Sequence, residues 1–225
     1  YRLIVCPEHL GTVFYLAKIG PEKAKYFRSC IFLESLGTGG QLALQESFTG
    51  SSLLDRAARH FLYTGGWDFR CEAFRKIIGN DETVWESPGF EVPAISLSRH
   101  PFPEYHTSMD NPDIIREDKL RESAEAVLGI LDILETDCRM ERKFTGLIAL
   151  SNPKYDLYIS PGTDPSIASA SDENRIKWNY LMDCLPRYFD RKTTIFEIAE
   201  KFGLPHRDVY LYLRKFREKE LIEFI

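Results

Sequence analysis

The chain has 225 residues, of which 44% are hydrophobic and 28% charged, and its formal net charge is -5. These values indicate a globular protein with one main core and room for a small second domain. The acidic balance argues against a general attraction to nucleic acid or to an anionic membrane surface. Five cysteines without CxxC spacing favour free thiols in a reducing compartment, so we expect a cytoplasmic protein.

No apolar run approaches the roughly 20 residues that a bilayer-spanning helix needs. No secretory signal is recognisable, and the sequence opens on Tyr1 rather than on methionine. We therefore expect a protein that does not associate with a membrane. We also expect the sequence to be a fragment of a longer chain.

The first predicted elements are a strand at residues 2–6 and a helix from Leu10 to about Ile19, ended by Gly20 and Pro21. Glu8 lies between them. Open α/β sheets place their ligand sites at the carboxyl ends of strands, which makes Glu8 a candidate site residue. The alternative is a carboxylate that only interacts with the dipole of the following helix.

Short apolar runs and amphipathic stretches then alternate along the chain. We expect strands at residues 29–35, 41–47, 67–74 and 92–97, and helices at residues 52–63 and 116–134. This alternation predicts an α/β domain over residues 1–150, with a largely parallel mixed sheet and helices on both faces.

The stretch from Gly79 to Asn111 contains two groups that could bind a metal. One is the acidic pair Asp81 and Glu82, and the other is His106. Carboxylate and imidazole together are a zinc-type ligand set. The alternatives are that Asp81 caps a turn or helix and that His106 lies on a surface loop bonded to Glu104.

Residues 151–174 are rich in serine, proline and glycine, and we interpret them as a linker or irregular excursion. Residues 175–225 then form a predicted winged helix-turn-helix domain, with helices at residues 194–202 and 206–219 and a final strand or wing at residues 220–225. From Asp190 onward this tail has eight Lys or Arg against seven Asp or Glu, which is not the basic footprint of a nucleic-acid-binding module. We assign it no nucleic-acid-binding residues and expect a docking or capping role.

The run GNDE, followed by SPGFEVP and YHTSMDN, resembles the closing half of the zinc aminopeptidase-like superfamily, which includes co-catalytic exopeptidases and glutaminyl cyclases. More closely, the chain resembles a bacterial and archaeal group with an aminopeptidase-like domain, of phosphorylase/hydrolase type, and a C-terminal winged helix. The resemblance implies that Asp81 and His106 are metal ligands. It also implies that Glu8, in CPEHLGT, is either the general base or a further ligand.

The same resemblance implies one or two zinc ions, with further ligands, a His and a bridging Asp, expected upstream of Tyr1. Other residues of these motifs would support the ligands or line the pocket: Glu82, Glu104, Tyr105, Thr107 and Asp110. The implied function is a zinc-dependent aminopeptidase-like hydrolase that acts on a peptide or a small amide-linked metabolite through metal-activated water. The alternative is a non-catalytic scaffold or regulatory module whose helix-turn-helix tail binds DNA or a protein partner, including a second copy of the chain.

Overall fold

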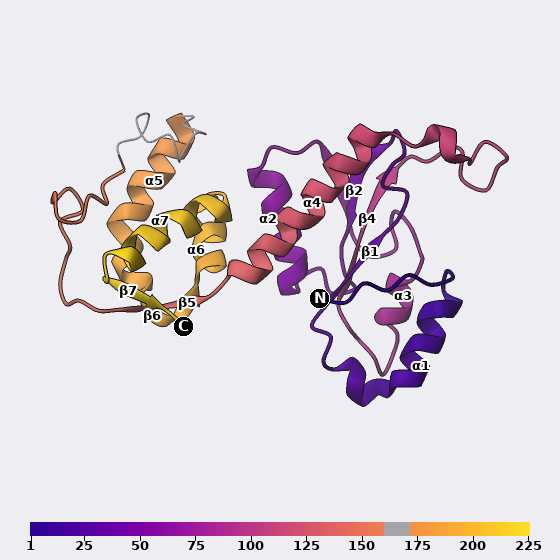
Figure 1. Ribbon diagram of the computed structural model, residues 1–225, viewed down its shortest axis with the longest axis horizontal. Coiled ribbons are helices and arrows are strands. Elements are labelled where there is room, and N and C mark those ends of the chain that lie inside the picture. Colours follow the sequence, from indigo (N-terminus) through magenta and orange to yellow (C-terminus); the bar gives the residue numbers. More distant parts are fainter. Residues whose placement is uncertain (160–171) are drawn as a thin grey trace. The chain divides into compact units, whose positions relative to one another are not determined.

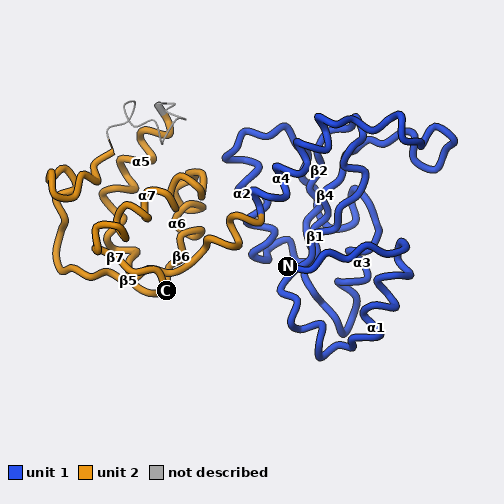
Figure 2. Tube along the Cα trace, viewed as in Figure 1, with its two compact units in different colours: residues 1–130 blue, residues 131–225 orange. Residues whose placement is uncertain are grey.

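The computed structural model describes residues 1–159 and 172–225. These form two compact units, residues 1–130 and residues 131–225, which are coloured separately in Figure 2. Within the described ranges, no helix combines the length and the apolarity that crossing a bilayer requires.

Unit 1 is built on a four-stranded sheet with the strand order β1-β4-β2-β3. The strands are β1 (Cys30–Leu33), β2 (Gln41–Gln45), β3 (Phe69–Glu72) and β4 (Ala94–His100). The pairs β1–β4 and β2–β3 are parallel, whereas β2 and β4 are antiparallel. The mixed α/β prediction is therefore confirmed, and the parallel pairing is interrupted once, at the centre of the sheet.

Helices lie on both sides of this sheet (Figure 1). The helices are α1 (Leu10–Ala24), α2 (Leu53–Thr64), α3 (Glu82–Trp85) and α4 (Glu117–Thr136), with a 3-10 turn η1 (Pro112–Ile114) before α4. Helices α2 and α4 pack closely, because a side chain at Gly129 would collide with the ring of Phe61. A capping box formed by Ser52 and Asp55 fixes the start of α2, as its sequence predicts.

Of two predictions near the N-terminus, one is corrected and one is confirmed. The strand predicted at residues 2–6 does not form, and the side chains of Leu3 and Val5 are 85% and 87% exposed. The run is apolar enough for a strand, but no described strand pairs with it. The predicted end of the first helix is confirmed, because Gly20 has non-helical backbone angles, with φ at 76° and ψ at 163°, and the residues from Pro21 to Ala24 form a further helical turn beyond this kink.

Unit 2 combines a three-stranded antiparallel sheet, in the order β6-β5-β7, with a group of helices. Its elements are β5 (Arg139–Arg142), α5 (Asp172–Cys184), the 3-10 turn η2 (Leu185–Tyr188), β6 (Asp190–Thr194), α6 (Ile195–Phe202), α7 (His206–Glu218) and β7 (Ile222–Phe224). The predicted helix pair and final strand are confirmed. A capping box at Thr194 starts α6, and Gly203 ends it in the left-handed conformation.

Part of the serine- and proline-rich stretch contributes to unit 2. Leu157 and Ile159 are buried in the same core as Trp178 and Phe216. The Tyr212 hydroxyl donates a hydrogen bond to the Leu157 carbonyl at 2.8 Å. The rest of that prediction falls on residues 160–171, which lie outside the described residues.

Candidate functional site

The turn that carries Glu8 is fixed by Asp81. The backbone N–H of His9 donates to Asp81 Oδ1 at 2.8 Å, which joins two segments 72 residues apart in sequence. His9 has a φ of 52°, an uncommon conformation for a residue other than glycine. The Asp81 carboxylate is buried, while the Glu8 side chain is 57% exposed at the surface of the site. Asp81 therefore holds the turn from which Glu8 reaches solvent.

A carboxylate that sequence reasoning missed, Glu34, lies directly after β1. Its backbone N–H extends the strand pairing by donating to the Leu97 carbonyl at 3.1 Å. Asn80 Nδ2 donates to Glu34 Oε1 at 3.4 Å, and Glu34 Oε2 is buried without a hydrogen-bond partner among the described residues. The signal that could have found Glu34 is its position, a carboxylate at the carboxyl end of a predicted strand.

Glu82 has the opposite environment, because hydrogen bonds occupy its carboxylate. The Asn80 N–H donates to both oxygens, at 2.9 and 3.0 Å, and Gln45 Nε2 donates to Oε1 at 3.3 Å. Gln45 Oε1 in turn accepts from the backbone N–H groups of Ile77 and Ile78. Glu82 therefore links the loop 77–82 to β2, and its carboxylate oxygens are engaged in hydrogen bonds that stabilise the fold.

We call Glu8, Glu34, Asp81 and Glu82 the acidic cluster. Burial raises the pKa of the Glu34 carboxyl, and the negative charges of Glu8, Glu82 and Asp81 raise it further, while the Asn80 bond opposes the rise. The pKa of the neighbouring Cys30 thiol is raised to about 12 by burial first and then by Asp81 and Glu82. Such a field disfavours additional negative charge and favours a bound cation or a protonated amine.

The loop that contains His106 is held by short-range bonds. The Glu104 carbonyl accepts from the N–H and the hydroxyl of Thr107 at 3.0 and 2.6 Å, and the Asp110 N–H donates to the Thr107 carbonyl. The rings of Tyr105 and His106 stack with their centroids 3.9 Å apart. Glu104 and Thr107 therefore shape the loop, while Tyr105 and His106 form its aromatic tip.

Tyr105 connects this loop with the acidic cluster. Its side chain is 42% exposed, yet burial raises the pKa of its hydroxyl, and Glu8, Glu34 and Asp110 add to the rise. The hydroxyl therefore lies within electrostatic reach of the cluster. His106 is exposed, and the bonded or stacked partner that the structure gives it is Tyr105.

The structure thus brings Glu8, Asp81, Glu82 and Tyr105 into one neighbourhood, together with Glu34 and Asn80. Across residues 1–159 and 172–225, no three His, Cys, Asp or Glu side chains converge closely enough to hold a metal ion. Oxygen donors of a suitable kind are nevertheless present, since no described group forms a hydrogen bond with the buried atoms Glu34 Oε2 and Asn80 Oδ1. The donor chemistry fits a cation, although the described residues do not form a complete set of metal ligands.

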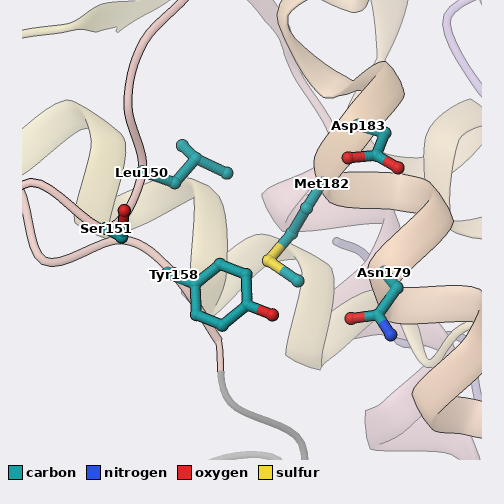
Figure 3. A pocket seen from close by; sticks show the side chains of 6 residues that line it. All are labelled: Leu150, Ser151, Tyr158, Asn179, Met182 and Asp183. Atoms are coloured by element: carbon teal, nitrogen blue, oxygen red, sulfur yellow. The ribbon is translucent and has the colours of Figure 1, made fainter.

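A separate pocket of about 380 Å³ lies in unit 2 and contains no predicted site residue (Figure 3). Its lining mixes apolar and polar side chains: Leu150, Ser151, Tyr158, Asn179, Met182 and Asp183. Its polar groups do not include the paired catalytic groups that would indicate a reaction.

The model of a family described as a domain of unknown function (DUF4910) matches residues 1–137. A curated Clostridium acetobutylicum (strain ATCC 824) protein is 25% identical over 232 residues, which cover 100% of this chain and 50% of that protein. It is provisionally named a polysaccharide biosynthesis protein with an aminopeptidase-like domain. The chain thus spans about half the length of this curated relative.

Solved structures resemble the chain as well. A crystal structure of a provisionally assigned peptidase from Clostridium acetobutylicum covers 98% of this chain and 47% of its own, with a TM-score of 0.75 at 20% identity. An aminopeptidase from Aneurinibacillus sp. strain AM-1 covers 55% of this chain and 30% of its own, with a TM-score of 0.47 at 19% identity. The first similarity shows a shared fold, and the second is too weak to support an assignment.

Proposed function

The chain belongs to the DUF4910 family, and from that premise we propose that it forms part of a zinc-dependent aminopeptidase-like hydrolase. The substrate would be a peptide or a small amide-linked metabolite. The main support for this proposal is the state of Glu34. This carboxylate is half-buried near Glu8 and Asp81, and one of its oxygens has no hydrogen-bond partner among the described residues. The description of the similar proteins as peptidase or aminopeptidase-like supports the same reaction class.

The bonding pattern suggests a division of roles that differs from the one implied by sequence resemblance. Asp81 Oδ1 already accepts from the backbone of His9, so we assign Asp81 to hold the Glu8 turn. Glu34 would hold the metal, and His106 keeps the ligand role that the sequence resemblance implies for it. Since no three-ligand group forms within the described residues, the proposal requires further ligands from a longer chain. A bound zinc ion would lower the pKa of a coordinated water to about 7 and polarise the scissile carbonyl.

Glu8 is the residue best placed to move a proton. Its side chain is largely exposed, and the bond from His9 to Asp81 fixes the turn below it. From this position it can take a proton from the attacking water and deliver it to the leaving amine. The negative field of the acidic cluster would attract the protonated amino terminus of a peptide, which suits an exopeptidase.

The test is amide hydrolysis by the full-length protein with a panel of aminoacyl p-nitroanilides. Glu8→Gln should lower kcat by at least about 100-fold, because a general base is removed while its shape is kept. Glu125→Gln, an exposed carboxylate on α4, is the matched control and should behave as wild type. Wild-type kcat in Glu8→Gln, or unchanged hydrolysis after zinc is removed with a chelator, would refute the proposal.

For unit 2 we propose a winged helix-turn-helix that docks a protein rather than nucleic acid. Helices α6 and α7, with the turn at Gly203 and the three-stranded sheet, have the required order of elements. Two of the cations of α7 form ion pairs within unit 2, since Arg207 pairs with Asp132 at 3.1 Å and Arg214 with Glu218 at 3.6 Å. Fluorescence anisotropy with duplex DNA at low salt should show no binding. Binding that falls steeply with salt would favour a regulatory DNA-binding module instead.

A further inference from the structure

A buried arginine, Arg99 of β4, connects several segments near the acidic cluster. Its side chain is only 1% exposed, and its guanidinium donates five hydrogen bonds between 2.9 and 3.1 Å. The acceptors are the carbonyls of Leu36, Gly40 and Lys119, the Glu122 carboxylate and the Ser123 hydroxyl. All three guanidinium nitrogens are used, as a buried charge requires.

The arginine and Ser123 meet at one atom, the carbonyl oxygen of Leu36. This oxygen accepts from Arg99 Nε at 2.9 Å and from Ser123 Oγ at 3.0 Å. A carbonyl oxygen has two lone pairs, so both are occupied. Leu36 follows Glu34 by two residues, and these two bonds therefore fix the chain just beyond the Glu34 carboxylate.

The intervening residue shows why such fixing is needed. Ser35 has a φ of 55°, a left-handed conformation that is unfavourable for a residue other than glycine. The Ser35 carbonyl accepts from the N–H and the hydroxyl of Thr38 at 3.1 and 3.0 Å. Without the bonds to Leu36 and Ser35, the turn would relax, and the direction of the Glu34 side chain would change with it.

The same arginine lies at the base of the loop that carries Tyr105 and His106. That loop leaves the sheet directly after His100, the residue that follows Arg99. Gly40, whose carbonyl Arg99 binds, has no room for a side chain, because a Cβ there would lie 2.7 Å from the Pro101 carbonyl oxygen. One guanidinium thus anchors the turn after Glu34 and the backbone at the start of the aromatic loop.

We propose that Arg99 and Ser123 are positioning residues for the active site, holding the turn 35–38 so that the Glu34 carboxylate stays against Asn80. This rests on the proposed hydrolase function. In the described part of the chain, the side-chain hydrogen bonds of Arg99 and Ser123 go to groups outside the acidic cluster. Their effect on the reaction passes through Leu36 and Ser35 to Glu34, and from Glu34 to the loop 77–82 through the Asn80 bond.

The experiment compares Ser123→Ala and Arg99→Lys with Arg121→Lys, an exposed arginine of α4, in the full-length protein. Hydrogen–deuterium exchange is followed in peptides covering residues 34–40 and 77–82. Ser123→Ala should speed exchange in both peptides, because losing the Leu36 bond frees Glu34 from Asn80. It should also lower kcat about tenfold with KM within about twofold of wild type, since the reacting groups are misplaced while substrate contacts remain. Arg99→Lys should have a larger effect, and Arg121→Lys none.

The outcomes separate a positioning role from a structural one. Faster exchange at residues 34–40 with unchanged exchange at residues 77–82 and unchanged kcat would overturn the proposal. If Arg99→Lys fails to fold, the milder Ser123→Ala variant, which keeps the arginine, still decides. Full activity of Glu34→Gln would refute the hydrolase assignment. The connection from Ser123 to Asn80 would still be tested separately, by whether Ser123→Ala speeds hydrogen–deuterium exchange in both peptides.

Discussion

Glu82 and Glu34 are glutamates of the same neighbourhood with opposite surroundings. Both oxygens of the Glu82 carboxylate accept hydrogen bonds, from Asn80 and Gln45. Within residues 1–159 and 172–225, the Glu34 carboxylate has one bond, of 3.4 Å, and one oxygen without a partner. Arg99, with its five acceptors, resembles Glu82, because the charged groups of both side chains are hydrogen-bonded within the fold. Burial and charge alone therefore do not identify a functional group. What marks it is bonding capacity that the fold leaves unused.

The largest effect is expected when the hydrogen-bonded carboxylate of Glu82 is removed. Glu82→Ala leaves the Asn80 N–H and the Gln45 amide without their acceptor in a buried place, so we expect a loss of about 2–3 kcal/mol in the free energy of unfolding. Urea denaturation followed by tryptophan fluorescence measures it. Glu125→Ala, on the exposed face of α4, should change stability by less than about 0.5 kcal/mol. Equal effects of the two substitutions would show that the network around Glu82 does not stabilise the fold.

Asp81 distinguishes support from metal ligation. Asp81→Ala removes the acceptor of the His9 N–H and should cost about 1 kcal/mol of stability and most of the activity. Asp81→Asn keeps an acceptor oxygen at the same place, so we expect it to restore both. The measurements are thermal unfolding and p-nitroanilide hydrolysis of the two variants side by side. Loss of zinc binding in Asp81→Asn would instead show that Asp81 is a metal ligand, as the sequence resemblance implies.

Glu34→Gln should sharpen the contrast with Glu82 by leaving stability nearly intact. Because burial and neighbouring carboxylates raise the Glu34 pKa, its ionised form is disfavoured in the folded state. A neutral glutamine should therefore unfold at the same or slightly higher urea concentration at pH 7, with a gain below about 1 kcal/mol given the partial solvent exposure. A clear loss of stability would mean that the Glu34 carboxylate has a structural role after all.

The smallest expected effect concerns Glu122, whose pKa is lowered by the Lys119 bond first and then by Arg99. A lowered folded-state pKa contributes stability above the unfolded value, 4.5, and this contribution is lost as pH falls through the folded-state pKa. Glu122→Gln should therefore flatten the decline in stability below about pH 4.5, by no more than about 1 kcal/mol. Urea titrations between pH 3 and 6 test this, and an unchanged acid limb would contradict it.

Much of the fold follows from local pattern, and the failures have physical causes. Helices α6 and α7 were predictable because their apolar faces, a Thr cap and a Gly stop agree. Strands β5 and β6 were not, because Arg139–Arg142 and Asp190–Thr194 are short and polar. The run at residues 2–6 reads as a strand by composition, but a strand also needs a partner, which one sequence does not reveal.

The site was partly predictable for the same reason. Glu8 and Asp81 lie in recognisable motifs, and the structure joins their segments. Glu34 was identifiable in principle from its place after β1. The bonds that decide between support and chemistry, such as Gln45 to Glu82 and Asn80 to Glu34, join residues 37 and 46 positions apart, and local sequence patterns do not reveal them.

Zinc affinity of the full-length protein, measured by competition with a chromogenic chelator for wild type and Glu34→Gln, tests the central claim most directly. Glu34→Gln should bind zinc at least about 10-fold more weakly while its unfolding transition stays unchanged. Equal zinc affinity in the two proteins, or no zinc binding by the wild type, would contradict it.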